Sequence, residues 1–205
     1  MICVVVLISA LLGLVSAEMV PLTMLDRVEY PYARCLDGSA GGYYVQPYAA
    51  DASKTKWVIY LNGGGECDSE EACKEQTGNA LGSSTFFPNS TNANAWFFAS
   101  DYCGDNPDFC EWNHVFDPYC SQDLHSGMRT VSTRDTWGLY FAGHLILRAV
   151  LDDLDTKYGL TDATEIILTG ASAGGIGVFM NVDYLATRYP QARVVAASIA
   201  GYYFY

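Results

Sequence analysis

Basic residues are scarce in this sequence, and no run of them occurs. Lysine and arginine together number 11 against 23 aspartates and glutamates, so the formal net charge is −12. Because nucleic acid is bound through lysine and arginine side chains that neutralise phosphates, the composition excludes nucleic acid as an expected partner. A strongly anionic polymer would also be repelled unless a local basic patch exists. We interpret the acidity as the ordinary charge of a soluble secreted protein.

Metal-binding patterns are lacking as well. The sequence has three histidines, none at ligand spacing, and no two cysteines separated by two residues. Zinc sites are typically built from such closely spaced ligands. We therefore expect no metal, and no motif requires an organic cofactor.

Long apolar runs are limited to residues 1–17, MICVVVLISALLGLVSA. The run ends in Val15-Ser16-Ala17, a small-residue pattern typical of signal peptide cleavage, although no basic residue precedes it. It is shorter than the ~20 residues that span a bilayer, and no later segment is long and apolar enough. We expect a cleaved signal peptide, a secreted mature chain and no stable membrane insertion. A buried N-terminal strand or a membrane anchor is the alternative.

Six cysteines remain in residues 18–205 once Cys3 is removed with the signal peptide. An even set in a secreted chain predicts disulfide bonds, but six cysteines allow 15 pairings and the sequence does not choose among them. The candidates are Cys35, Cys67, Cys73, Cys103, Cys110 and Cys120. Asn89, followed by Ser90 and Thr91, matches the acceptor pattern for N-glycosylation and lies in a polar stretch.

Hydrophobic periodicity predicts strands that alternate with helices. Residues 56–61, 165–169 and 193–200 are apolar and β-branched, which is typical of strands. Residues 135–158 and 175–189 have the spacing of helices. This alternation favours an α/β fold with a mostly parallel sheet.

Two local features complete this outline. The first helix is expected to begin at a cap on Asp135 or Thr136 and to end at Gly159. Residues from about 66 to 125 are predicted to form an irregular insertion held by disulfides. Within it, Asp68 is expected to cap a short helix, because Glu71 follows three residues later.

The stretch Gly170-Ala171-Ser172-Ala173-Gly174 fits the pattern G-x-S-x-G between a predicted strand and a predicted helix. That context presents a nucleophilic serine on a sharp turn, where flanking glycines avoid a clash with a Cβ. The Ala173 N–H would open the helix and is a natural donor to an oxyanion. A closely packed glycine turn or a phosphate site is the alternative, but the spacing and lysine of a P-loop are missing.

A second glycine motif supports the nucleophile interpretation. Residues 57–65, WVIYLNGGG, are a predicted strand followed by three glycines. In α/β-hydrolases an earlier strand ends in such a loop, whose N–H groups complete the oxyanion hole. The two motifs occur here in the expected order.

Four stretches together resemble the pectin acetylesterase/Notum family of secreted α/β-hydrolases, and the last two resemble its Notum branch more closely. The stretches are CLDGSAGGYY (35–44), LNGGGECDSEEAC (61–73), NPDFCEWNHVFDPYCSQDLHSG (106–127) and TGASAGGIGVFMNVD (169–183). The resemblance implies an α/β-hydrolase fold with helices on both faces of the sheet. It also implies that Ser172 is the nucleophile and that the N–H groups of Gly64, Gly65 and Ala173 form the oxyanion hole.

Two departures from the family pattern are candidate substrate contacts. Glu66 stands where the family usually has an aromatic residue, and His125 where the Notum branch has one. An inward-pointing Glu66 would disfavour a long lipid chain. The implied substrates are an acylated glycan or a lipidated protein.

The base and acid of a catalytic triad are not evident. In α/β-hydrolases they follow the serine along the chain, whereas His114, His125 and His144 all precede Ser172, and only Asp183 is acidic after it. We expect the chain to be a C-terminally truncated portion of one domain, inactive by itself. The alternatives are a non-enzymatic glycan- or lipid-binding protein, which need not keep a strained turn, and a cysteine-stapled structural domain, which explains neither glycine motif.

Overall fold

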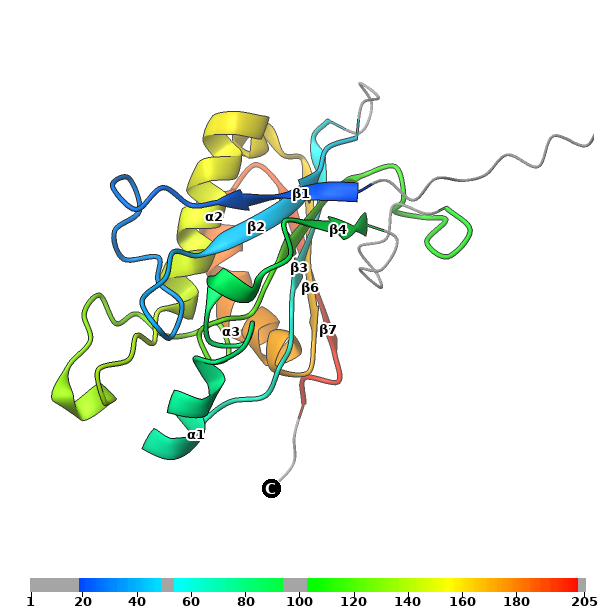
Figure 1. Cartoon of the computed structure of the whole chain (residues 1–205). Coiled ribbons are helices and arrows are strands. Elements are labelled where there is room, and N and C mark those ends of the chain that lie inside the picture. The colour runs from blue at the N-terminus through cyan, green and yellow to red at the C-terminus, as the bar shows by residue number, and fades with distance from the viewer. Residues whose placement is uncertain (1–18, 49–53, 94–102, 203–205) are drawn as a thin grey trace, which may run out of the picture.

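The computed structural model describes residues 19–48, 54–93 and 103–202, and its centre is a seven-stranded sheet (Figure 1). The strands lie in the order β4-β1-β2-β5-β3-β6-β7. Their bounds are β1 Met19–Met24, β2 Gly42–Gln46, β3 Lys56–Leu61, β4 Ser90–Asn92, β5 Asn113–Asp117, β6 Glu165–Ala171 and β7 Arg193–Ile199. The predicted signal peptide lies outside the described residues.

The sheet is mixed rather than uniformly parallel. Strands β5, β3, β6 and β7 are parallel neighbours, which confirms the predicted α/β core. Strand β1 pairs antiparallel with β4 on one side and with β2 on the other, and β2 pairs antiparallel with β5. The carboxyl ends of β3, β5 and β6 therefore meet at one edge of the sheet, where ligands bind in open α/β folds.

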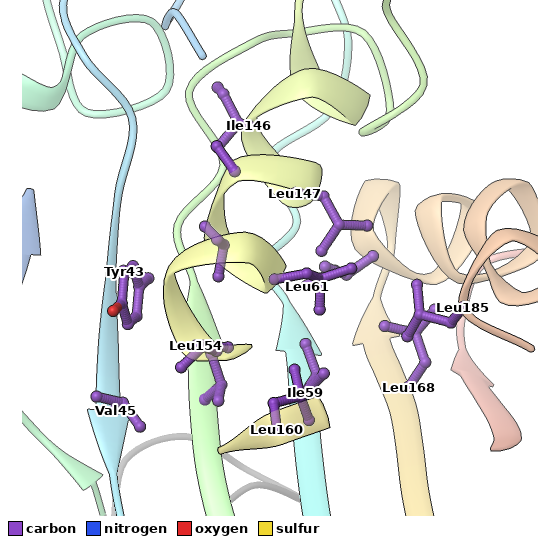
Figure 2. Close-up of a cluster of buried hydrophobic side chains, with 14 of the residues drawn as sticks. Tyr43, Val45, Ile59, Leu61, Ile146, Leu147, Leu154, Leu160, Leu168 and Leu185 are labelled. Carbon is purple, nitrogen blue, oxygen red and sulfur yellow. The ribbon is translucent and has the colours of Figure 1, made fainter. Parts of the chain in front are cut away.

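Two long helices, α2 (Gly143–Tyr158) and α3 (Ala173–Arg188), cover the same face of the sheet (Figure 1). Figure 2 shows Ile146, Leu147 and Leu154 of α2 beside the strands, and Leu185 of α3 against Leu168 of β6. Helices were predicted on both faces of the sheet. In the residues that the structure describes, the long helices lie on one face.

The opposite face carries aromatic and aliphatic side chains. Tyr44, Val58 and Tyr60 form a separate cluster there, against which Phe116 and Ile167 pack. The rings of Tyr60 and Phe116 are stacked with their centroids 5.6 Å apart. Alternation along each strand explains both clusters, because Trp57, Ile59 and Leu61 point to the helices while their neighbours point away.

The predicted start of the first long helix is wrong by more than a turn. Arg134–Thr136 form a short 3-10 turn, after which Trp137 (φ 56°) and Gly138 (φ 79°) adopt left-handed backbone conformations that interrupt the helix. Helix α2 begins only at Gly143. Its C-terminal cap is Gly159, the residue predicted to end it. The short helix α1 (Glu70–Gln76) is capped by Ser69 rather than by Asp68.

The structure resolves the disulfide pairing that the sequence left open. The pairs are Cys35–Cys120, Cys67–Cys73 and Cys103–Cys110. The first joins the segment before β2 to the segment after β5, and the other two close short loops within the predicted insertion. Among residues 19–48, 54–93 and 103–202, none of the helices is long and apolar enough to cross a membrane.

Candidate active site

Ser172 occupies the single residue between strand β6 and helix α3, in a conformation that few non-glycine residues adopt. Its φ is 56° and its ψ is −123°. Its N–H donates to the Ile199 carbonyl at the end of β7 (2.9 Å), and its carbonyl accepts from the Ile176 N–H in the first turn of α3 (3.0 Å). The residue is half-buried at the carboxyl edge of the sheet. Such strain persists only where the surroundings enforce it, and it is concentrated at functional sites.

The two flanking glycines are required by close backbone approach. A Cβ on Gly170 would lie 2.6 Å from the Leu61 carbonyl oxygen, and a Cβ on Gly174 would clash with the same carbonyl. Leu61 and Gly170 are register partners in the parallel pair β3–β6. The clash expected from the sequence pattern is therefore real, and the group that causes it belongs to the end of β3.

The glycine loop that follows β3 lies against Ser172. A Cβ on Gly63 would be 3.2 Å from the Cβ of Ser172 and would clash with the Ala171 carbonyl oxygen. Gly64 and Gly65 are exposed, so their N–H groups are accessible. Ala173 is the first residue of α3, where an N–H has no acceptor within the helix. The structure thus brings the predicted nucleophile and the loop of predicted oxyanion donors together.

His125 lies behind this loop rather than beside a substrate. The residue is 2% exposed, and its Nε2 is 2.9 Å from the Asn62 carbonyl oxygen. Its Nδ1 is 3.9 Å from Oδ2 of Asp117, which is fully buried at the end of β5. Burial lowers the pKa of His125 to about 4 and raises the pKa of Asp117. This placement argues against the expected substrate contact.

Asp117 was not among the sequence candidates. The signal available was an acidic residue at the end of an apolar strand, directly before Pro118, but that position alone does not reveal burial. Both carboxyl oxygens of Asp117 lack a hydrogen-bond partner in the part of the chain that the structure describes. An unsatisfied buried carboxyl of this kind costs stability and requires an explanation.

The other histidines are engaged within the fold. His114 is buried, and its Nε2 is 2.9 Å from the Phe109 carbonyl oxygen. His144 on α2 contacts Asn181 on α3, with 2.7 Å between Nδ1 and Oδ1. Asp183 is exposed on α3. The two histidines have the packing roles expected of them.

Two further candidates lie on the surface. Glu66 is exposed directly after Gly65, at the rim of the site, and its role as a substrate contact stays a prediction. Asn89 is exposed before β4, which leaves it accessible to glycosylation. No cluster of metal-ligating side chains was found in the described ranges.

A family model described as pectinacetylesterase matches residues 15–205. The chain belongs to the pectinacetylesterase family. Pectin acetylesterase 4 of Arabidopsis thaliana is 34% identical over 189 residues, which are 91% of this chain and 45% of that protein. The palmitoleoyl-protein carboxylesterase NOTUM of Schmidtea mediterranea is 40% identical over 157 residues, which are 76% of this chain and 29% of that protein. The chain spans less than half the length of these curated relatives.

A solved structure to which the chain is similar has the same fold. The Wnt deacylase Notum from Drosophila superposes with a TM-score of 0.76 at 30% sequence identity, covering 88% of this chain and 52% of the Notum chain. The α/β-hydrolase-like architecture expected from the sequence is thereby confirmed. The two curated relatives, a pectin acetylesterase and a palmitoleoyl-protein carboxylesterase, are both carboxylic-ester hydrolases.

An apolar cavity shares a wall with the glycine loop of this pectinacetylesterase chain. Its volume is about 220 Å³, and Asn62 forms part of its lining. A Cβ on Gly64 would clash with Leu81 and lie 3.1 Å from the Tyr119 ring, and both of these residues also line the cavity. The remaining lining residues are Tyr44, Ala80, Phe87, Pro88, Thr91, Phe116 and Pro118. The segment after α1 therefore forms one wall of the cavity, through Ala80, Leu81, Phe87, Pro88 and Thr91.

Proposed function

We propose that this chain carries the nucleophile and the oxyanion hole of a secreted serine carboxylic-ester hydrolase that removes an O-linked acyl group. The observation that carries the proposal is Ser172, held in a left-handed turn against the glycine loop. Family membership supports the reaction class.

The proposed reaction proceeds through an acyl-enzyme. Ser172 Oγ attacks the ester carbonyl carbon, and the N–H groups of Gly64, Gly65 and Ala173 stabilise the oxyanion of the tetrahedral intermediate. The alcohol leaves with a proton, and the acyl group stays on Oγ. Water then attacks the acyl-enzyme through a second tetrahedral intermediate and releases the carboxylic acid.

A serine hydroxyl requires a base for this attack. His125 is buried behind the loop, and its lowered pKa makes it a weak base. His114 and His144 are engaged elsewhere. We therefore propose that the base and its orienting acid are not among these 205 residues. The greater length of the relatives supports this assignment, and the chain by itself is proposed to be inactive.

The proposed substrate is an O-acyl ester whose acyl group enters the cavity beside the loop. The cavity is larger than an acetyl group requires, and its lining is mainly aromatic and aliphatic. It therefore favours a longer acyl chain, as on a lipidated protein serine, over an acetylated polysaccharide. A series of chromogenic esters tests this choice, with a rise in kcat/KM beyond acetate expected. A preference for acetate would assign the polysaccharide instead.

The decisive experiment uses the native secreted protein, a fluorophosphonate probe and intact mass spectrometry. We expect one adduct on Ser172, absent from Ser172→Ala, on a species heavier than residues 18–205. Absence of labelling on a folded native protein would overturn the hydrolase proposal and favour a glycan- or lipid-binding protein. Labelling of a species with the mass of residues 18–205 would overturn the assignment of the base.

A further inference from the structure

The backbone of Asn62, the residue that precedes the glycine loop, is held at both its N–H and its carbonyl. The Asn62 N–H donates to the Asp117 carbonyl (3.0 Å), and the Asn62 carbonyl faces Nε2 of His125 at 2.9 Å. Asp117 ends β5 and His125 lies in the segment that follows it. One short stretch of chain therefore clamps the point where β3 turns into the loop.

The Asn62 carbonyl determines which ring nitrogen of His125 carries the proton. A carbonyl oxygen only accepts hydrogen bonds, so Nε2 must be the donor. Nδ1 is then a lone pair in the neutral ring, and it faces the Asp117 carboxyl at 3.9 Å. Burial lowers the pKa of His125, which agrees with a neutral ring, and burial also raises the pKa of Asp117.

The position of His125 is fixed by two strained backbone conformations and by contacts with α3 and Tyr119. Leu124 and His125 both have left-handed backbone conformations, with φ 60° and 55°. The Nδ2 of Asn181 on α3 donates to the His125 carbonyl (2.9 Å), and the ring lies against Tyr119 with 4.8 Å between centroids. A Cβ on Gly177 would lie 3.0 Å from the His125 Cβ, so α3 leaves room for this side chain.

We propose that His125 is a positioning residue of the oxyanion hole, acting through the Asn62 carbonyl. The proposal rests on the proposed hydrolase function. Three consecutive glycines have little conformational rigidity of their own, whereas oxyanion donors act only when their direction is fixed before the reaction. The hydrogen bond from His125 supplies that constraint at Asn62, the residue directly before the three glycines. Asp117 lies on the other side of the ring, with its Oδ2 3.9 Å from Nδ1.

The kinetic test uses His125→Phe and His125→Gln in the full-length secreted protein. Phenylalanine keeps the ring and its contact with Tyr119 but has no N–H, whereas the glutamine amide restores a donor. Loss of a direct oxyanion donor lowers kcat by about 100- to 1000-fold. A loop whose donors are present but displaced should therefore lower kcat by about tenfold or more. We expect kcat to fall in His125→Phe with KM nearly unchanged, and to recover partly in His125→Gln. Equal kcat in His125→Phe and the native protein would overturn the proposal.

Two further readouts do not depend on activity. Nitrogen-correlated NMR of native His125 should show the neutral form with the proton on Nε2, and a proton on Nδ1 alone would overturn the proposal. Amide hydrogen exchange at Asn62, whose N–H is protected by its bond to the Asp117 carbonyl, should accelerate at least tenfold in His125→Phe. We call this rate loop exchange. The matched control is His114→Phe, which removes a buried histidine from the other face of the sheet and should leave loop exchange unchanged.

These outcomes separate the two proposals. If the native protein shows no hydrolysis that depends on Ser172, the hydrolase function fails, and the tautomer and exchange data still decide whether His125 holds the loop. If hydrolysis is present but loop exchange is the same in His125→Phe and the native protein, the clamp is overturned. Equal acceleration in His114→Phe would also overturn it, because the effect would then be general destabilisation.

Discussion

Ser172 adopts its left-handed conformation because neighbouring backbone leaves no other path for the chain. Its N–H is fixed by the Ile199 carbonyl, while Gly170 and Gly174 let the Leu61 carbonyl approach from β3. Glycine is used at these two places for space, whereas at Ser172 the unusual φ falls on a residue with a side chain. The strain is thus placed on the residue that carries the proposed chemistry.

Gly174→Ala should damage both stability and labelling. The added Cβ would clash with the Leu61 carbonyl, which belongs to a central strand and has little freedom to move. Overpacking of this kind costs about 1–3 kcal/mol. Urea unfolding and fluorophosphonate labelling should both show the loss. Gly78→Ala is the control, because its Cβ would make only an ordinary contact at 3.4 Å from the Glu75 carbonyl oxygen.

The buried pair of His125 and Asp117 should shape the dependence of stability on pH. An unfolded histidine has a pKa of about 6.5, and the folded pKa of His125 is about 4. The unfolded chain therefore takes up a proton first as the pH falls. The His125 contribution to stability is complete above about pH 6.5 and is lost toward pH 4. Asp117 has the opposite sign, because its raised pKa makes its contribution fall as the pH rises.

His125→Gln should therefore flatten the fall in unfolding free energy between pH 6.5 and pH 4. Asp117→Asn should steepen it, because the opposing contribution of the carboxyl is removed. The titratable groups that the described residues place against the His125 ring are Asp117 and Tyr119. Urea titrations across this range measure the slopes, and identical slopes in the native protein and His125→Gln would contradict the prediction.

Element boundaries show how far sequence patterns reach. Strands β3, β6 and β7 and helix α3 were predictable, because each has a continuous local pattern and a glycine or proline at its end. The start of α2 was not predictable, because the apolar spacing typical of a helix continues through Trp137, whereas the backbone adopts a left-handed conformation at that residue. Strands β1 and β2 were missed, since their pairing depends on each other and on β5. The contact of His125 with Asn62 spans 63 residues, so no local pattern indicates it.

The C-terminal end of α3 is attached to α2 by a charged group. Arg188 donates to Asp152 (2.5 Å) and Asp155 (2.6 Å) of α2, and its side chain is 22% exposed. Arg188→Met should destabilise the fold by about 1–3 kcal/mol, because hydrogen bonds to charged groups are each worth about 1.5–3 kcal/mol and partial exposure discounts them. Lys74→Met is the control on an exposed pair with Glu70 and should change stability little. Equal denaturation midpoints for the two variants would contradict the prediction.

At the scale of the whole molecule, α2 and α3 cover one face of the sheet, and the described residues place no long helix over the other. Strand β7 pairs only with β6 in the described ranges, and Val195 within it is 40% exposed. The resemblance to a longer hydrolase was readable from sequence motifs. The lack of a covering helix on the other face of the described structure was not readable, because a sequence motif indicates the structure around its own residues and not what packs on the far side of the sheet.

The three disulfides should contribute unequally to the stability of the molecule. Cys35–Cys120 joins residues separated by 85 positions, whereas Cys67–Cys73 spans 6. Chain entropy predicts about 4–5 kcal/mol for the long loop and about 2 kcal/mol for the short one. Replacing each pair by alanine and measuring thermal unfolding tests this order. A larger loss from the Cys67–Cys73 pair would contradict it.

The hydrogen bond between Ser172 and Ile199 means that the turn at Ser172 can be completed only after β7 has been synthesised. The serine is synthesised before the strand whose carbonyl accepts its N–H, with the whole of α3 between them. Chains fold largely from the N-terminus as they are made. Until β7 joins the sheet, the turn lacks the bond that offsets its backbone strain. The backbone geometry proposed for the nucleophile can therefore form only after Ile199 has been added to the chain.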